Sequence, residues 1–250
     1  MIFQVFTNAQ QFVLTDSINV ENKRIKSIET DLYNSIYLIS DTKVEKVFEN
    51  QKSTTLDFKN IITSVDSSNP LRFYLYSNYN KLSILDENLN PIQDAITFSS
   101  NDYIPTALKI ADNQFCWFYD MLSNKIVYYN YQLQKTILSS KQLYLKNNDQ
   151  SIDKIHLYKN LVYLKGQHTI YIYDDYGNFK SNLEIELKNE PFLFYKNFLF
   201  YKKNNKLYSL NLENNTTSTF IDLKEVKSIA LNERNLYALN DNYVFIFSIK

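Results

Sequence analysis

FCWFYDMLSNKIVYYNYQLQ, residues 115–134, consists of an apolar run, a polar turn, a second apolar run and a second turn. Runs rich in aromatic and branched residues and bounded by Asn, Ser or Asp are typical of paired β-strands. The same order recurs in LRFYLYSNYNKLSILDENLN, NLVYLKGQHTIYIYDDYGNF and NFLFYKKNNKLYSLNLENNT, residues 71–90, 160–179 and 197–216. Weaker copies start at Ser35 and Asn235. A unit of about 40 residues is therefore repeated along the whole chain.

Each copy is preceded by one more short apolar segment. These segments are IKSIET, IITSVD, PTALKIAD, IDKIHLY, PFLFY and VKSIAL, which begin at residues 25, 61, 105, 152, 191 and 226. A fourth segment follows the first five copies, as in IQDAITF, KTILSS, KSNLEIEL and TSTFIDL. Six repeats of four strands predict an all-β fold, a six-bladed β-propeller of four-stranded antiparallel blades.

The last repeat lacks a fourth segment, since the sequence ends at Lys250 after its third. The stretch FVLTDSINV from Phe12 resembles the fourth segments of the other repeats. We therefore expect Phe12 to Asp16 to pair with Tyr243 to Ile249 and complete the last blade, which removes an exposed strand edge. Residues 11–250 are expected to form a single domain.

The composition supports strands and specifies the turns. Tyr and Phe number 21 and 17, and many runs, such as FYLY from Phe73, are apolar on both faces. Strands covered on both faces lose the alternation of apolar and polar residues. Because only Gly166 and Gly177 are glycines, the positive φ angles of the turns are expected to fall to Asn and Asp.

Charge and cysteine content exclude several classes of function. Lys plus Arg and Asp plus Glu balance at 27 each, so no net field favours nucleic acid or an anionic membrane. Cys116 is the only cysteine, which excludes a disulfide framework or a cysteine metal site. No apolar stretch reaches the roughly 20 residues of a transmembrane helix. We expect no cofactor.

The first residues, MIFQVFTNAQ, have two interpretations, and one of them is a targeting signal. Small residues at Thr7 and Ala9 after a short apolar run are typical of the end of an export signal. In that case residues 1–10 are the remnant of such a signal, and the protein is extracytoplasmic, in the periplasm or envelope of a bacterium. The alternative is an ordinary closing strand of a cytoplasmic protein.

The run WFYDMLSNKI from Trp117 resembles the crossing from the second to the third strand in NHL and YWTD propellers. The order of an aromatic strand, an Asp and an Asn-Lys turn carries this resemblance. It implies six blades and, usually, binding to a protein or glycan partner. It implies no catalytic residues.

Two sets of candidate binding residues follow from the repeat. Lys43, Lys81, Lys125 and Lys206 stand at equivalent positions after the middle turn, where they form either an anion-attracting rim or an ordinary solvated one. Trp117 and Tyr119 are candidates for stacking on a sugar or anchoring a protein interface. The alternative for these aromatic residues is packing between blades.

Catalytic and metal-binding patterns are weak. His156 and His168 are the only histidines, and no third ligand accompanies them. We therefore predict a non-catalytic propeller that binds a protein in the cell envelope. The alternatives are a carbohydrate-active enzyme or glycan-binding lectin, and a purely structural subunit. The enzyme would need two convergent carboxylates, for which the candidates are Asp102, Asp149, Asp153 and Glu190.

Overall fold

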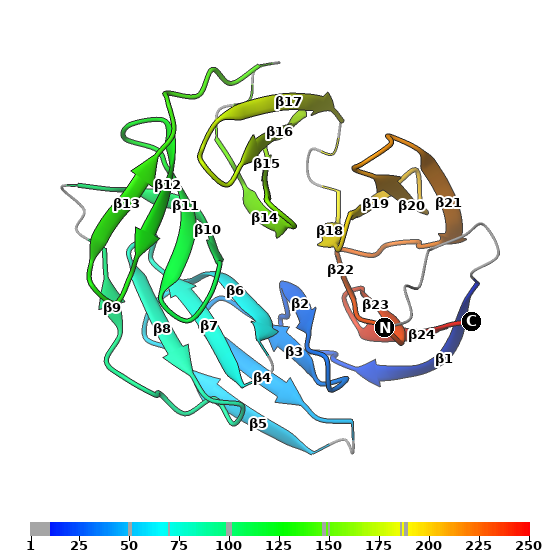
Figure 1. Cartoon of the computed structure of the whole chain (residues 1–250). Helices are drawn as coiled ribbons and strands as arrows, with labels where there is room; N and C mark the ends of the chain where they lie inside the picture. Colours follow the sequence, from blue (N-terminus) through cyan, green and yellow to red (C-terminus); the bar gives the residue numbers. More distant parts are fainter. Residues whose placement is uncertain are drawn as a thin grey trace. The chain divides into compact units, whose positions relative to one another are not determined.

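The computed structural model describes residues 11–250 except 50–51, 70, 99–101, 147–148, 150, 186 and 188–189. The proposed signal remnant, residues 1–10, lies outside the described residues. The chain divides into two compact units, one formed by residues 1–57 and 189–250 and the other by residues 58–188. Six four-stranded antiparallel sheets make up the fold, three in each unit (Figure 1). Each sheet is one blade, which confirms the predicted repeat.

The first unit contains three blades. In strand order they are β2-β3-β4-β5, β18-β19-β20-β21 and β1-β24-β23-β22. The first blade has β2 (Ser27–Thr30), β3 (Ile36–Ile39), β4 (Lys43–Val47) and β5 (Ser53–Asp57). The second has β18 (Phe192–Tyr195), β19 (Phe198–Lys203), β20 (Lys206–Asn211) and β21 (Thr217–Asp222). The third has β1 (Phe12–Asn19), β22 (Ser228–Leu231), β23 (Asn235–Leu239) and β24 (Tyr243–Ile249).

The second unit contains the other three blades, and their strands follow sequence order. Its first blade has β6 (Ile62–Asn69), β7 (Arg72–Ser77), β8 (Lys81–Leu85) and β9 (Ile96–Thr97). The next has β10 (Pro105–Ile110), β11 (Phe115–Asp120), β12 (Lys125–Asn130) and β13 (Lys135–Ser139). The last has β14 (Lys154–Tyr158), β15 (Leu161–Lys165), β16 (Thr169–Asp174) and β17 (Phe179–Glu184). The outer strand expected in IQDAITF is reduced to the two residues of β9.

The predicted pairing of the two ends of the chain is confirmed. β1 pairs antiparallel with β24, with Phe12 opposite Ile249 and Asn19 opposite Tyr243 (Figure 1). The pairing extends past Asp16 and contains a register shift between Leu14 and Asp16. A strand from the beginning of the sequence thus supplies the outer strand of the last blade.

Burial within a blade depends on the position of the strand. Second strands such as β11 are buried on both faces, because the two neighbouring blades of the same unit cover them. Outer strands such as β13 alternate exposed and half-buried residues, as expected of a sheet with one solvated face. In each unit, apolar side chains of adjacent blades form the core, for example Ile28 and Leu38 with Tyr237 and Leu239.

The expectation about turns is correct for Asn and wrong for Asp. Seven of the fourteen described non-glycine residues with positive φ are Asn, and none is Asp. Aspartates instead accept backbone hydrogen bonds inside the turns. Asp86 Oδ1, for example, accepts from the N–H groups of Asn88 and Asn90 at 2.9 and 2.8 Å. A carboxylate accepts without donating, so it stabilises a turn by capping its N–H groups.

Candidate interaction surface

Exposed apolar side chains stand at both ends of the blades in the second unit. Leu71, Leu133 and Tyr176 lie in turns at one end and are between 65% and 75% exposed, and a second set lies at the end where the blades are joined. Because the strands are antiparallel, each turn between a second and a third strand lies at the same end as the loops that join successive blades. Five large apolar residues at this end are between 48% and 86% exposed. We call these residues the apolar rim: Ile61, Tyr79, Met121, Leu122 and Tyr144.

Hydrogen bonds hold the turns of the apolar rim against the neighbouring loops. Asn78 N donates to Ile61 O at 3.0 Å, and Ile61 N donates to Asn78 Oδ1 at 3.1 Å. Met121 N donates to Ile104 O at 3.0 Å. Because these backbones are fixed, the exposed side chains are presented at defined positions and would lose little conformational freedom on binding.

The loop next to Tyr144 is held in the same way. Leu143 N donates to Asn124 O, and Asn124 Nδ2 donates to Leu143 O, both at 2.7 Å. Leu143 itself is buried, whereas Tyr144 is 86% exposed. The loop thus anchors one apolar residue and directs the next into solvent, where it adds a large aromatic surface to the rim.

Tyr79 has a backbone conformation that bulky residues seldom adopt. Its φ is 55°, beside Asn78 at 50°. An L-residue with a Cβ in the left-handed region costs roughly 1 kcal/mol or more, and Asn tolerates this better than Tyr. The side chain nevertheless remains 53% exposed, so burial does not offset this cost in the isolated chain.

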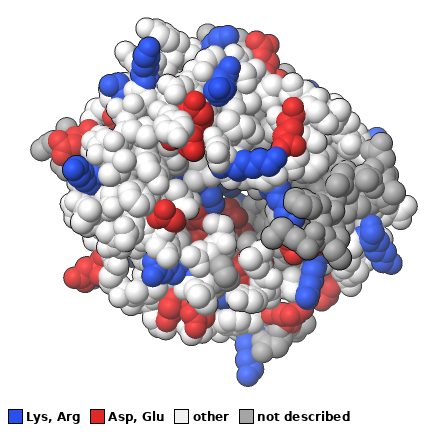
Figure 2. Space-filling view, viewed as in Figure 1, with Lys and Arg blue, Asp and Glu red and all other residues white. Residues whose placement is uncertain are grey.

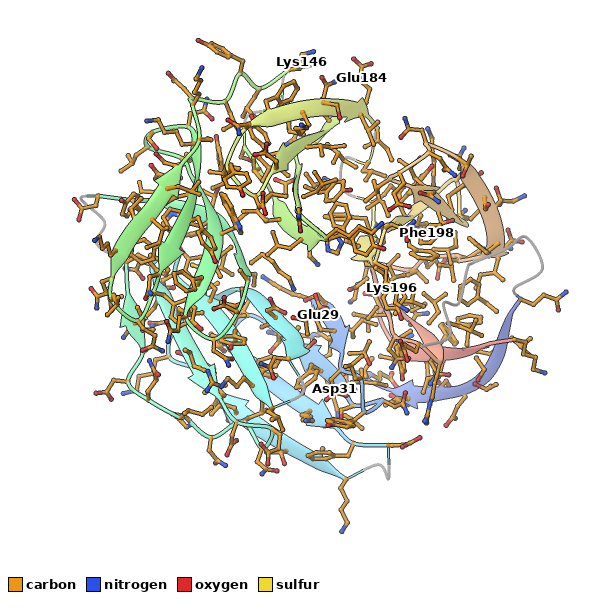
Figure 3. The ribbon with its side chains drawn as sticks, viewed as in Figure 1. Glu29, Asp31, Lys146, Glu184, Lys196 and Phe198 are labelled. Carbon is orange, nitrogen blue, oxygen red and sulfur yellow. The ribbon has the colours of Figure 1, made fainter. Side chains whose placement is uncertain are left out.

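Lysines stand beside the apolar rim. Lys81 begins β8 and Lys125 begins β12, while Lys59 and Lys141 lie in the loops at the same end. None of these four lysines forms an ion pair with a described residue. Lys146, further along the same loop, donates from Nζ to Asn182 Oδ1 at 3.2 Å (Figure 3).

The carboxylates at this end of the second unit are mostly engaged. Asp120 is 1% exposed, and its Oδ1 accepts from Ile104 N at 2.8 Å. Asp149 is buried: its Oδ1 accepts from His168 N at 2.7 Å and its Oδ2 from Tyr171 Oη at 3.1 Å.

Three further carboxylates at the same end are exposed, and one of them is Glu184, the last residue of β17 (Figure 3). Asp153 Oδ2 lies 3.2 Å from the buried Lys165 Nζ. Asp102 is exposed in the loop before β10. With Asp153 paired to a buried lysine, the cationic groups of the rim exceed its unpaired anionic groups in the described loops.

The corresponding end of the first unit is different. Three of its lysines are paired with carboxylates: Lys26 with Asp41, Lys227 with Asp241 at 2.8 Å, and Lys202 with Glu190 at 3.3 Å. Lys43 and Lys206 form no ion pair with a described residue. Tyr243, at 39% exposed, is the one large exposed apolar residue in the described turns and loops at that end. Basic and acidic side chains are interspersed over the face that Figure 2 shows.

The residues singled out from the sequence have separate locations. Lys43, Lys81, Lys125 and Lys206 each begin a third strand, as the repeat predicts. Lys81 and Lys125 belong to the second unit, beside the apolar rim, whereas Lys43 and Lys206 belong to the first.

Trp117 and Tyr119 are buried in the core between two blades, at 4% and 2% exposed. The Trp117 ring packs against Tyr128 with centroids 5.0 Å apart, and Tyr119 Oη donates to Asn124 Oδ1 at 2.6 Å. Neither side chain is exposed to stack on a partner. Tyr119 instead supports the turn that carries Met121 and Leu122.

The apolar rim was missed in the sequence because its residues are scattered over several loops. One local signal was available: Met121 and Leu122 interrupt a turn that is otherwise polar. Within the described part of the chain, no group of three His, Cys, Asp or Glu residues is placed to hold a metal ion. No helix among the described residues is long and apolar enough to span a membrane.

Comparison with solved structures establishes the fold. Virginiamycin B lyase from Staphylococcus aureus is similar with a TM-score of 0.67 at 13% identity, over 95% of this chain and 99% of the lyase. BamB from Moraxella catarrhalis is similar with a TM-score of 0.58 at 9% identity, over 95% of this chain and 99% of BamB. Both are propeller proteins. This chain is a six-bladed β-propeller.

A chain of the mitotic checkpoint complex is also similar, with a TM-score of 0.64 at 9% identity, over 99% of this chain and 95% of the other. Neither a protein-family model nor a curated protein sequence matches. The similar structures include a lyase and a member of a complex, and at these identities they show the fold alone. A functional assignment must therefore come from the surface of this chain.

Proposed function

We propose that this chain is a non-catalytic propeller that binds another protein through the apolar rim, in the cell envelope of a bacterium. The observation that carries the proposal is the exposure of Ile61, Tyr79, Met121, Leu122 and Tyr144 on turns and loops that hydrogen bonds hold against their neighbours. Exposed apolar side chains grouped in this way are typical of interaction sites on soluble proteins, and aromatic residues dominate binding energy at such sites.

The scaffold, one of the similar structures and the first residues of the chain also support the proposal. Binding residues are commonly carried on loops that a rigid scaffold positions, and the rim turns are hydrogen-bonded to their neighbours. The mitotic checkpoint complex, whose chain shares this fold, is an assembly by its name. The envelope location rests on the interpretation of residues 1–10 as the end of an export signal.

The alternative of a carbohydrate-active enzyme gains no specific support. Asp149 accepts from a backbone N–H and a tyrosine hydroxyl, and Asp153 is paired with Lys165. These contacts are typical of carboxylates that stabilise a blade. We therefore do not propose a reaction.

Photo-crosslinking in cells of the source organism tests the proposal. A benzoylphenylalanine placed at Leu122 or Tyr144 should crosslink one defined partner, which mass spectrometry identifies in the envelope fraction. Leu133, which is 73% exposed in the turn between β12 and β13 at the opposite end of its blade, is the matched control and should give no such product. Absence of a defined product at both rim positions, or the same product at Leu133, would overturn the proposal.

A further inference from the structure

We infer that the partner segment bound by the apolar rim is acidic and amphipathic, with carboxylates interleaved among apolar side chains. This inference rests on the proposed function and specifies the chemistry of the partner. It is carried by the lysines that accompany the rim residues in the described loops.

Almost every rim residue has a lysine within three positions along the chain. Lys59 precedes Ile61, Lys81 follows Tyr79, and Lys125 follows Leu122. Lys141 precedes Tyr144, which Lys146 follows. The order of an exposed apolar residue and then a lysine at the start of a third strand recurs in two adjacent blades. A partner with carboxylates at matching intervals would meet both kinds of group together.

These lysines are available for a partner, as are Lys43 and Lys206 at the equivalent strand positions of the first unit, whereas other lysines at the same end of the first unit are paired. Lys59, Lys81, Lys125 and Lys141 form no ion pair with a described residue. At the same end of the first unit, Lys227 is held 2.8 Å from Asp241 and Lys202 3.3 Å from Glu190. Complementary charges at the edge of an interface speed association and select among partners more than they add affinity. The apolar rim would supply the buried area.

The charge of the whole chain favours a protein segment over a lipid surface. Anionic bilayers attract proteins through clusters of basic residues that act over a Debye length. Here the formal net charge is zero, and acidic and basic side chains are interspersed (Figure 2). The unpaired lysines beside the rim alternate along the chain with its exposed apolar residues, which suits short-range pairing with a segment of defined sequence.

Fluorescence anisotropy with synthetic peptides tests the inference on the full chain. Three labelled peptides share one amphipathic pattern of Leu and Phe and carry Glu, Gln or Lys at every polar position. We expect the Glu peptide to bind at least about tenfold more tightly than the Gln peptide, and the Lys peptide more weakly than either. Raising NaCl from about 50 to about 300 mM should weaken only the Glu peptide, because salt screens exposed charges.

Variants assign the effect to the rim. The double charge reversal Lys81→Glu and Lys125→Glu should weaken the Glu peptide by about tenfold or more and strengthen the Lys peptide. Lys206→Glu changes the equivalent strand position in the first unit and is the matched control, which should leave all three affinities unchanged. Leu122→Ser with Tyr144→Ser should weaken the Glu and Gln peptides alike. Circular dichroism confirms that each variant is folded.

The outcomes test the acidic character of the partner and the proposed protein-binding function separately. Equal binding of the Glu and Gln peptides, or no effect of the charge reversal, overturns the acidic partner while a crosslinked partner at Leu122 keeps the proposed function. Binding to vesicles of phosphatidylcholine and phosphatidylglycerol at about 3:1, lost on charge reversal, overturns the inference in favour of a lipid surface. Concentration-dependent dimerisation in light scattering, abolished by Leu122→Ser, would assign the rim to a second copy of the chain and likewise overturn it.

Discussion

Lys46 Nζ lies 3.4 Å from Asp31 Oδ2 in the first blade, with the two side chains only 3% and 1% exposed. Asp31 Oδ2 also accepts from Tyr37 Oη at 3.0 Å, and its Oδ1 accepts from Ser35 N at 2.9 Å. Asp31 lies just after β2 (Figure 3). Next to it, Asn232 Nδ2 donates to Asp31 O at 3.3 Å. The bond from Asn232 to Asp31 links this buried polar cluster of the first blade to the blade that β1 completes.

Removing the cation of this pair should destabilise the chain strongly. Lys46→Met leaves the buried Asp31 carboxylate without its ammonium partner, and such losses cost about 3–5 kcal/mol. Lys23→Met is the matched control, because Lys23 is 41% exposed in its pair with Glu45 and such pairs contribute about 1 kcal/mol or less. Urea denaturation followed by Trp117 fluorescence measures both. Similar losses for the two variants would contradict the prediction.

Gly166→Ala should destabilise the last blade of the second unit. An added Cβ would lie 2.3 Å from Asp149 Oδ2 and 2.6 Å from Asp149 Cγ, and Asp149 is held by His168 N and Tyr171 Oη. Crowding of this kind in a packed site costs about 1–3 kcal/mol. Thermal unfolding of Gly166→Ala, Asp149→Ala and the double variant forms a cycle. The cost of Gly166→Ala should largely vanish in the Asp149→Ala background, and an unchanged cost would exclude the clash as its cause.

Acid should destabilise the second unit through Asp66. Burial alone would raise the pKa of this carboxyl, but Lys109 at 2.8 Å and hydrogen bonds from Ser68 outweigh it and lower the pKa below its usual value. A carboxyl whose pKa is lower in the folded state stabilises it above the unfolded pKa of about 3.9, and this contribution is lost as the pH falls through the folded pKa. Unfolding free energies at neutral and acidic pH should therefore differ less in Asp66→Asn. An identical pH dependence in the two proteins would disprove this role.

Cys116 should be unreactive in the folded chain. The side chain is fully buried, and burial raises the pKa of its thiol well above the usual value. The thiolate is the reactive form, so a disulfide reagent at mildly alkaline pH should label the native protein far more slowly than the denatured one. Rapid labelling of the native protein would mean that this core opens readily.

Phe12 should hold β1 in place. It is 6% exposed, and its ring meets Phe220 edge-on with centroids 5.2 Å apart. Phe12→Ala should cost about 3–5 kcal/mol, as large-to-small changes in cores do. Leu14, on the same strand, is 56% exposed, and Leu14→Ala should change stability by less than about 0.5 kcal/mol. Hydrogen exchange of β1 and β24 should accelerate only in Phe12→Ala, and equal protection in both variants would show that the ring does not anchor the strand.

The repeat in the sequence determined the blades and most of their strands. Strands and turns can be predicted because each follows from the residues of its own segment: apolar runs indicate strands, and turn residues between them indicate turns. This held even for the pairing of β1 with β24, because the last repeat lacked one strand and the first residues supplied a matching pattern. It was weaker for turn conformation, where tertiary context placed Tyr79 and Leu89 at positive φ without glycine.

What only the tertiary structure decided is which side chains face solvent and which find partners. Trp117 and Tyr144 are both aromatic residues close to loops in the sequence, yet one is 4% and the other 86% exposed. Lys81 and Lys227 are both lysines at blade ends, but only Lys227 meets a carboxylate. Exposure and pairing depend on residues of other strands or other blades, which lie outside the local segment, so no local pattern could reveal them.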